Sequence, residues 1–146
     1  MSEPVIRFMR LKDVDAVAEI EQETFARPWS RESFRQEVTR NAVARYLVAE
    51  EEGKIVGCGA IGPYWGKEDE SSLFTVFVHP DFQGKGAGRA IVETLEADEY
   101  ALRARRIEIP ASITGLPFYQ KMGYSFKDGK DTLDEEQLYR LEKYRT

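Results

Sequence analysis

A glycine-rich loop between an apolar run and a helical segment carries the clearest chemistry in this chain. Residues 73–78 are rich in β-branched and aromatic side chains, and the loop that follows is Gln83-Gly84-Lys85-Gly86-Ala87-Gly88. Glycine allows positive φ and a close approach of the backbone to a ligand. The helix that begins at Arg89 presents free N–H groups and a positive dipole end. Lys85 and Arg89 add positive charge, so the pattern predicts a phosphate-binding loop.

The spacing of the glycines excludes two common classes of phosphate-binding motif. A nucleoside-triphosphate P-loop requires Ser or Thr after its lysine, whereas Gly86 follows Lys85 in this chain. A dinucleotide fingerprint, Gly-x-Gly-x-x-Gly, requires Gly or Ala in its last place, and Arg89 or Ile91 occupies that place here. The loop must therefore serve another phosphate ligand, or be an ordinary strand-to-helix turn.

The order Gln83-x-x-Gly86-x-Gly88 after an apolar strand resembles the loop of the GNAT superfamily, whose members are acetyl-CoA-dependent N-acetyltransferases. In that family the loop holds the pyrophosphate of coenzyme A, so the resemblance implies acetyl-CoA as the co-substrate. It also implies that the strand end Val76-Phe77-Val78 pairs with the pantetheine arm and polarises the thioester carbonyl through a backbone N–H. The cofactor-binding residues that we expect are therefore residues 76–78 and 83–89.

A second segment, Phe118-Tyr119-x-x-x-Gly123-Tyr124, resembles the other GNAT signature, a helix whose tyrosine lies beside the thioester. The resemblance implies that Tyr119 donates a proton to the thiolate leaving group. A buried aromatic of the core is the alternative interpretation of Tyr119.

The acceptor amine needs a base, because an alkylammonium with a pKa of roughly 10 cannot attack a carbonyl. Many relatives place a glutamate on the strand before the glycine loop, where this chain has Thr75. Glu108, on the strand before the tyrosine helix, is therefore the candidate base. A surface charge on an edge strand is the alternative interpretation of Glu108, and a water relayed to a backbone carbonyl could also accept the proton.

Two segments bear on the acceptor. The run Phe25-Ala-Arg-Pro-Trp-Ser30 resembles the first helices of ribosomal-protein alanine N-acetyltransferases, and residues 111–119 are more similar to GNAT enzymes that act on small amines. We therefore expect a small amine or a peptide N-terminus as acceptor, with Tyr64 and Trp65 lining its side. A non-catalytic acyl-CoA sensor or interaction module of the same fold is the alternative function.

Length and composition favour a single domain spanning residues 1–146 in a cytoplasmic protein, and the resemblance implies that it is a GNAT domain. The net charge of −5 argues against nucleic acid as a partner. One cysteine and one histidine leave no histidine-based metal site, and we expect no metal. The longest apolar runs fall short of the roughly 20 residues that span a bilayer, so no membrane association is expected. A homodimer formed through the last strands is left open.

The element order predicted from hydrophobic periodicity is β-α-α-β-β-β-α-β-α-β-β. This order indicates an α/β (α+β) fold in which helices flank a mixed central sheet. The resemblance implies the GNAT acyl-CoA N-acyltransferase fold. One helix is expected to run from Arg89 to about Arg106, with Leu102 inward and Arg103, Arg105 and Arg106 as surface charges at its negative end. The expected strands are residues 5–9, 46–50, 54–61, 73–78, 107–109, 124–127 and 137–144.

Overall fold

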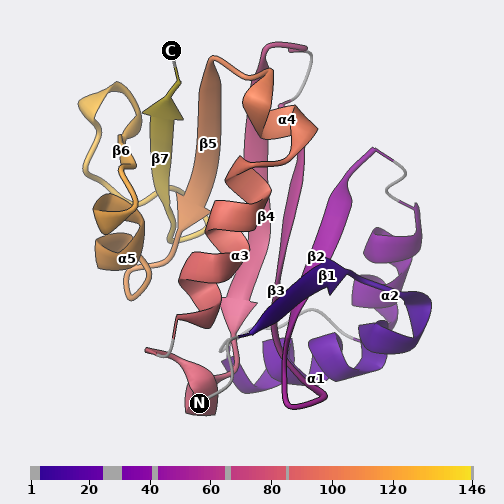
Figure 1. The fold of residues 1–146 in the computed structure, drawn as a ribbon. Coiled ribbons are helices and arrows are strands. Elements are labelled where there is room, and N and C mark those ends of the chain that lie inside the picture. Colours follow the sequence, from indigo (N-terminus) through magenta and orange to yellow (C-terminus); the bar gives the residue numbers. More distant parts are fainter. Residues whose placement is uncertain (1–3, 25–30, 41–42, 65–66, 85, 146) are drawn as a thin grey trace. The chain divides into compact units, whose positions relative to one another are not determined.

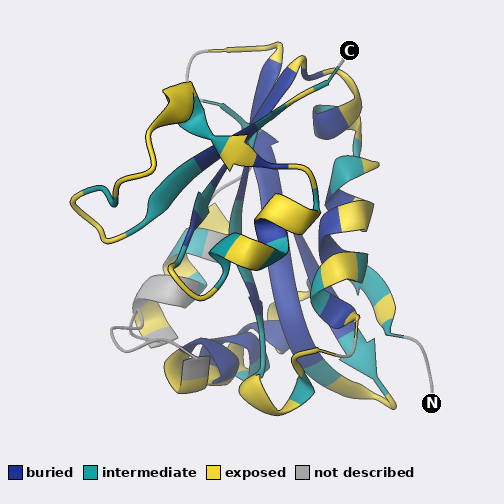
Figure 2. Cartoon of the chain, turned by 90° about the vertical axis from the view of Figure 1, so that its left-hand side faces the viewer, coloured by how far each residue is buried: buried dark blue, intermediate teal, exposed yellow. Residues whose placement is uncertain are grey.

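The computed structural model describes residues 4–24, 31–40, 43–64, 67–84 and 86–145 (Figure 1). Its strands are hydrogen-bonded in the order β1-β2-β3-β4-β5-β7-β6. The pair β4–β5 is parallel, and the pairs β1–β2, β5–β7 and β6–β7 are antiparallel. The predicted mixed sheet with helices is therefore confirmed. Buried positions concentrate along the strands, whereas each α-helix also presents exposed positions (Figure 2).

The chain divides into two compact units, one within residues 1–60 and 75–97 and the other within residues 61–74 and 98–146. Strands β3 and β4 each begin in one unit and end in the other. The single domain expected from the sequence stays a prediction. Among the described helices, none has both the length and the apolar character needed to cross a membrane.

The first unit contains the N-terminal strands and the helix that follows the glycine loop. A turn with positive φ at Glu52 and Gly53 joins β2 to β3, which is the backbone that a tight hairpin requires. A Cβ at Gly59 would lie 2.5 Å from Cγ2 of Ile91, so this glycine allows α3 to pack closely on β3. The elements are β1 (Val5–Phe8), η1 (Leu11–Asp13), α1 (Val14–Thr24), α2 (Arg31–Arg40), β2 (Arg45–Glu51), β3 (Lys54–Pro63), β4 (Glu70–Val78), η2 (Pro80–Phe82) and α3 (Ala87–Glu96).

The second unit contains the parallel pairing of β4 with β5 and the C-terminal hairpin. Tyr119 on α5 and Leu141 on β7 are both buried in it. Gly123, with φ of 100°, follows α5 and has the left-handed backbone typical of a glycine that ends a helix. The elements are α4 (Glu99–Leu102), β5 (Arg106–Ala111), α5 (Leu116–Lys121), β6 (Ser125–Phe126), η3 (Lys127–Gly129) and β7 (Tyr139–Tyr144).

The predicted helix from Arg89 to Arg106 is wrong in its second half. Helix α3 ends at Glu96, and the Asp98 carboxylate then accepts a hydrogen bond from the Tyr100 N–H at 2.9 Å, which caps a separate short helix. Leu102 is 66% exposed rather than inward. Arg106 is the first residue of β5 and is buried, so it is not a surface charge at a helix end.

Candidate functional site

The glycine loop follows β4 and has the backbone conformation that its sequence predicts. Gly84 and Gly86 have φ values of 77° and 91°, which residues with a Cβ rarely adopt. The Gln83 amide donates a hydrogen bond from Nε2 to the Val78 carbonyl at 3.0 Å, which fastens the loop to the strand end. A Cβ at Gly84 or Gly86 would have no non-neighbouring atom within 4 Å, so the backbone there borders open space. Lys85 lies outside the described residues.

Helix α3 begins directly after this loop and presents its N-terminus there. Its first turn holds no acidic side chain, and the first intrahelical bond runs from Ala90 N to Gly86 O at 3.0 Å. The N–H groups of Ala87, Gly88 and Arg89 therefore precede the hydrogen-bonded helix and suit an anion. The Arg89 guanidinium contacts Glu93 at 2.7 Å instead, and its side chain is 72% exposed. Pyrophosphate binding by Arg89 and the loop stays a prediction.

The last residues of β4 follow a backbone position that is sparsely populated for a β-branched residue. Thr75 has φ of 55°, and its carbonyl accepts a hydrogen bond from the buried Cys58 thiol at 3.2 Å. Phe77 is buried in the core of the first unit, so its side chain is not available to a ligand. Any contact of Val76, Phe77 and Val78 with a cofactor must therefore use backbone groups or the half-buried valines, and this contact stays a prediction.

One face of the sheet in the second unit is charged, and the opposite face is apolar. Strand register places Ser72 opposite Glu108, and Glu108 opposite Glu142. Residues that are opposite across a ladder share a face, as do alternate residues of one strand. The charged face therefore collects Glu70, Ser72 and Phe74 from β4, Arg106, Glu108 and Pro110 from β5, and Arg140 and Glu142 from β7. The other face carries Leu73, Ile107, Ile109 and Leu141, which are buried.

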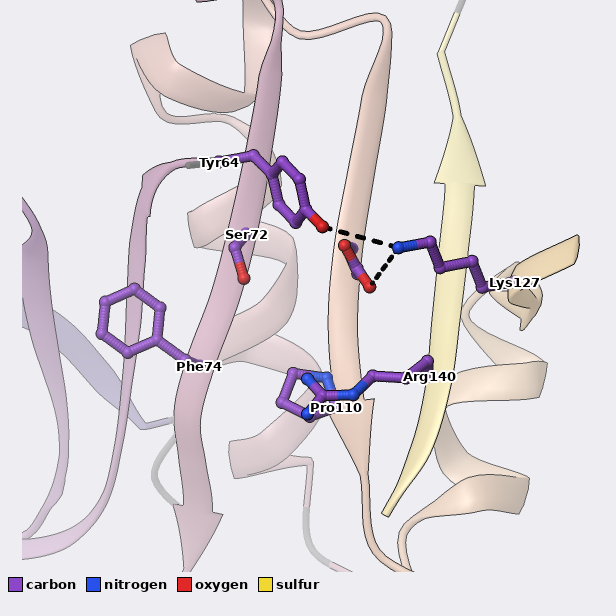
Figure 3. Close-up of a pocket in the computed structure, with 7 residues that line it drawn as sticks. Tyr64, Ser72, Phe74, Pro110, Lys127 and Arg140 are labelled. Carbon is purple, nitrogen blue, oxygen red and sulfur yellow. Dashed lines mark hydrogen bonds and ion pairs between the residues drawn. The ribbon is translucent and has the colours of Figure 1, made fainter. Parts of the chain in front are cut away.

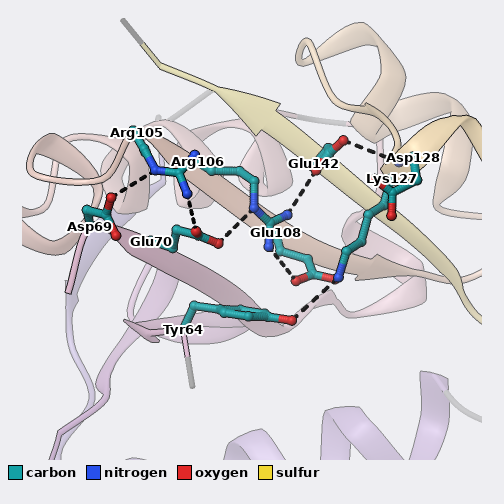
Figure 4. Close-up of polar contacts among 9 residues, drawn as sticks. All are labelled: Tyr64, Asp69, Glu70, Arg105, Arg106, Glu108, Lys127, Asp128 and Glu142. Carbon is teal, nitrogen blue, oxygen red and sulfur yellow. Dashed lines mark hydrogen bonds and ion pairs between the residues drawn. The ribbon is translucent and has the colours of Figure 1, made fainter. Parts of the chain in front are cut away.

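Arg106 binds three carboxylates on this face, one from each strand (Figure 4). Its Nε, Nη2 and Nη1 atoms donate to Glu70, Glu108 and Glu142 at 2.9, 3.1 and 3.0 Å. None of these four side chains is more than 11% exposed. Burial alone would lower the pKa of Arg106, but the hydrogen bonds to Glu70 and Glu108 outweigh it and raise that pKa. The buried cation is thus fully paired, as burial of charge requires.

Glu108, the candidate base, is buried in β5 between β4 and β7. Its interpretation as a surface charge on an edge strand is therefore wrong. Oε2 accepts from Arg106, and Oε1 accepts from Lys127 Nζ at 3.2 Å. Lys127 Nζ also lies 3.5 Å from the Tyr64 hydroxyl oxygen. Burial lowers the pKa of Lys127, but its bond to Glu108 raises that pKa overall, which keeps Lys127 cationic. A carboxylate has about four acceptor positions, so Glu108 retains capacity for a ligand N–H.

Glu108, Lys127 and Tyr64 border a pocket of about 390 Å³ that lies entirely within the second unit (Figure 3). That volume falls near the lower end of the range of roughly 300–1,000 Å³ for small-molecule sites. Tyr64 lines this pocket, its expected place beside the acceptor stays a prediction, and Trp65 lies outside the described residues. Among the described residues, no group of three or more His, Cys, Asp or Glu is arranged to hold a metal ion. The lining residues are Tyr64, Ser72, Phe74, Glu108, Pro110, Lys127 and Arg140.

Tyr119, the candidate acid, lies on α5 and is 7% exposed. Its ring packs edge-on against Phe118 and Tyr124, with centroid distances of 5.0 and 6.3 Å. Burial raises the pKa of the Tyr119 hydroxyl above its ordinary value, so the group holds its proton at neutral pH. Tyr119 is not among the residues that line the pocket. Its position suits both a core aromatic and a proton donor, and its catalytic role stays a prediction.

The sequence patterns above do not predict five of the pocket residues, namely Ser72, Phe74, Pro110, Lys127 and Arg140. A signal for one of them was present in the alternation of β7. Arg140 and Glu142 are separated by Leu141, and Arg106 and Glu108 are separated by Ile107 in the same way. Two Arg-x-Glu strands that each alternate with an apolar residue indicate a charged face over an apolar one. Lys127 lies in η3 and carries no comparable signal.

Comparison with known proteins connects this site to one family. Residues 14–124 match the model that describes the Acetyltransferase (GNAT) family. The chain is 32% identical over 126 residues to a Bacillus subtilis (strain 168) protein named "Putative [ribosomal protein bS18]-alanine N-acetyltransferase", with 81% of this chain and 78% of that protein covered.

Two crystal structures have the same fold. The Escherichia coli ribosomal-protein-S18-alanine N-acetyltransferase matches with a TM-score of 0.75 at 20% identity, covering 97% of this chain and 94% of that one. The PaiA N-acetyltransferase from Thermoplasma acidophilum, in complex with coenzyme A, matches with a TM-score of 0.75 at 16% identity, covering 99% and 100%.

The segment that matches the family contains the glycine loop, Glu108 and Tyr119. The glycine loop and the Tyr119 segment, which carry the resemblance to this family, are thus parts of one continuous match. Residues 25–30, on which the resemblance to ribosomal-protein alanine N-acetyltransferases rests, lie outside the described residues. The family match and the 32% identical relative together show that this chain belongs to the GNAT family of acetyltransferases.

Proposed function

We propose that this enzyme transfers the acetyl group of acetyl-CoA to a primary amine, on a small molecule or a peptide N-terminus, by direct attack. The observation that carries the proposal is the buried carboxylate of Glu108 at the wall of a pocket, held by Arg106 and Lys127. A carboxylate fixed in this way can receive an ammonium and accept its proton.

The glycine loop is the proposed binding site of the coenzyme A pyrophosphate. The free N–H groups at the start of α3 and the positive φ of Gly84 and Gly86 support this assignment. The backbone of Val76, Phe77 and Val78 would hold the pantetheine arm and donate an N–H to the thioester oxygen as it gains charge. Acetyl-CoA supplies the activated acyl group, and this family uses it.

Glu108 would orient the acceptor amine and take its proton, directly or through a water. Lys127 contributes a second effect, because a cation beside an ammonium favours loss of the ammonium proton. The neutral nitrogen then forms a bond to the thioester carbonyl carbon, the carbon–sulfur bond breaks, and the nitrogen gives up its second proton to solvent, from which Tyr119 regains the proton that it donates. Tyr119 would give a proton to the departing thiolate, so the products are an amide and a free thiol. No electron is transferred in either direction.

The first experiment is calorimetric titration with acetyl-CoA, followed by a free-thiol release assay over small amines and N-terminal peptides. Binding with release for one acceptor class would support the enzyme and identify its acceptor type. Binding without release across the panel would instead favour a non-catalytic acyl-CoA module. Absence of binding would contradict the assignment of the glycine loop.

The roles of the two catalytic candidates are tested by Tyr119→Phe and Glu108→Gln. We expect each to lower kcat by about 10²- to 10⁴-fold, the usual contribution of a general acid or base. The affinity for acetyl-CoA should stay within about twofold, because neither residue belongs to the proposed loop. Tyr144→Phe is the matched control, since Tyr144 is 62% exposed on β7. An unchanged kcat in Tyr119→Phe would remove Tyr119 as the acid.

A further inference from the structure

The pocket in the second unit carries more positive than negative charge. Among its lining residues Lys127 and Arg140 are cations and Glu108 is the anion. Glu108 is already shared, since Arg106 binds one of its oxygens and Lys127 the other. An acceptor that brings two positive charges would therefore have one carboxylate of the lining to pair with and two cations beside it, of which Arg140 is itself paired with Asp134. A second positive charge on the acceptor would be repelled by Lys127 and Arg140, which disfavours its binding.

Arg140 is held in a definite orientation at the edge of this pocket. It lies directly opposite Pro110 in the β5–β7 ladder, and Figure 3 shows its side chain extending to that proline. Its Nε donates to the Asp134 carboxylate at 2.7 Å. That carboxylate also accepts the backbone N–H groups of Leu138 and Glu136, at 3.0 and 2.8 Å, which fix its position. The Asp134 contact uses only the Nε edge of the guanidinium, and a carboxylate can pair with the terminal N–H groups.

The anion and this cation are placed at neighbouring positions of the same face. Glu108 and Pro110 are two residues apart in β5, and Arg140 is the ladder partner of Pro110. Two residues of an extended strand span about 7 Å. A short molecule with an amine at one end and an acid at the other would match this separation. The pocket volume of about 390 Å³ also suits a small molecule.

We propose that the acceptor is a small amine that also carries a carboxylate, with its amine at Glu108 and its carboxylate at the Arg140 guanidinium. Lys127 lies at the Glu108 end and adds to the positive field. This inference rests on the proposed acetyl transfer and narrows its acceptor class. Arg140 is thus a specificity-determining residue. A diamine, or an amine with no second charged group, is a poor acceptor.

The test compares amines that differ only in the functional group at the end of the molecule opposite the amine. Glycine, β-alanine and γ-aminobutyrate are each paired with the corresponding primary amide, and putrescine serves as the diamine. We expect kcat/KM for the best acid to exceed that of its amide by about tenfold or more, which is the effect of one charge-assisted hydrogen bond. Equal rates for an acid and its amide, or a preference for putrescine, would overturn the proposal.

Arg140→Gln isolates the residue. The variant should raise KM for the acid about tenfold, leave kcat within about twofold, and leave the amide unaffected. Arg140→Lys should retain part of the preference for the acid. Arg103→Gln is the control, because Arg103 is an exposed arginine of the same unit that does not line the pocket. An equal loss for acid and amide in Arg140→Gln would indicate a structural role only and overturn the proposal.

Two further measurements separate this proposal from acetyl transfer itself. Selective acetylation of Gly-Glu over Gly-Gln, with no turnover of the free amino acids, would contradict the small acceptor and point to a peptide N-terminus. If no amine leads to release of thiol, the proposed acetyl transfer is refuted. Calorimetric titration with N-acetyl-γ-aminobutyrate then tests separately whether the pocket binds a carboxylate at Arg140. Binding that Arg140→Gln weakens about tenfold supports that site, whereas absent or unchanged binding refutes it.

Discussion

Replacing Arg106 by methionine removes one cation from a buried group of three carboxylates. Methionine fills much of the same volume without charge, so the change tests the ion pairs rather than the packing. Glu70, Glu108 and Glu142 each lose a hydrogen bond of 2.9 to 3.1 Å. The variant therefore asks how strongly the second unit depends on this single guanidinium.

The magnitude follows from the partners that remain. Glu70 keeps Arg105 at 2.7 Å, and Glu108 keeps Lys127 at 3.2 Å. Among the described residues, Glu142 keeps only one backbone N–H, at 3.4 Å. The loss thus corresponds to one unpaired buried charge rather than three, and such a charge costs about 3–5 kcal/mol. Because each kcal/mol lowers the midpoint of a chain of this size by about 2–4 °C, Tm should fall by about 6–20 °C.

Urea titration at pH 7 and pH 5, with thermal melts beside it, measures this cost. The cost should be smaller at pH 5, because protons can neutralise the uncompensated carboxylate in the folded variant. That carboxylate then holds its proton more tightly in the folded variant than in the unfolded chain, so its own contribution to the stability of the variant falls as pH rises. Arg103→Met is the control. The exposed Arg103 guanidinium lies 4.7 Å from the Tyr100 ring centroid, so this variant should lose less than about 1 kcal/mol of unfolding free energy.

The double variant Arg106→Met with Glu142→Gln decides whether Glu142 dominates. Removing the orphaned charge should restore a large part of the lost stability relative to Arg106→Met alone. Two results would refute the reasoning. One is a loss in Arg106→Met no larger than in Arg103→Met, and the other is a double variant that is less stable than the single one.

Three other features give shorter predictions. Gly86→Val should weaken acetyl-CoA binding about tenfold, because the left-handed backbone costs a β-branched residue about 1–2 kcal/mol. Gly86→Asn should weaken binding less, and equal calorimetric affinities for the two variants would contradict this. Gly59→Ala should lower the free energy of unfolding in urea by about 1–3 kcal/mol through overpacking against Ile91. An unchanged urea midpoint would show that α3 can shift away from β3 at no cost in stability. Cys58 is buried, and burial raises the pKa of its thiol, so a thiol reagent at pH 8 should modify it only at the rate of unfolding; rapid labelling of the folded protein would disagree.

The parts of the structure that the sequence predicts well are those that local residue choice controls. Gly84 and Gly86 adopt positive φ because the loop must turn sharply between strand and helix. The turn at Glu52 and Gly53 is determined in the same local way. Hydrophobic periodicity likewise places most strands within a few residues of their observed bounds.

The pocket could not be predicted in this way because its residues meet only through strand register. Ser72, Glu108 and Arg140 are far apart in the chain and become neighbours through the ladders of β4, β5 and β7. The buried Arg106 misleads for a related reason, since an arginine near the end of a helical pattern is ordinarily a surface charge. The break at Asp98 was available locally, as an N-cap residue, but the apolar spacing through Leu102 masks it.

The three-way pairing of Arg106 has a consequence for how the strands find one another. Its partners Glu70 and Glu142 are each 36 residues away in the sequence. A slip of β7 by one residue would turn Glu142 to the apolar face and bring a neighbour with no carboxylate into its place. Such a misaligned sheet would bury charges without partners on both faces, so it would be less stable than the native sheet. The Arg106 guanidinium therefore favours the native register of β4, β5 and β7 over a register shifted by one residue.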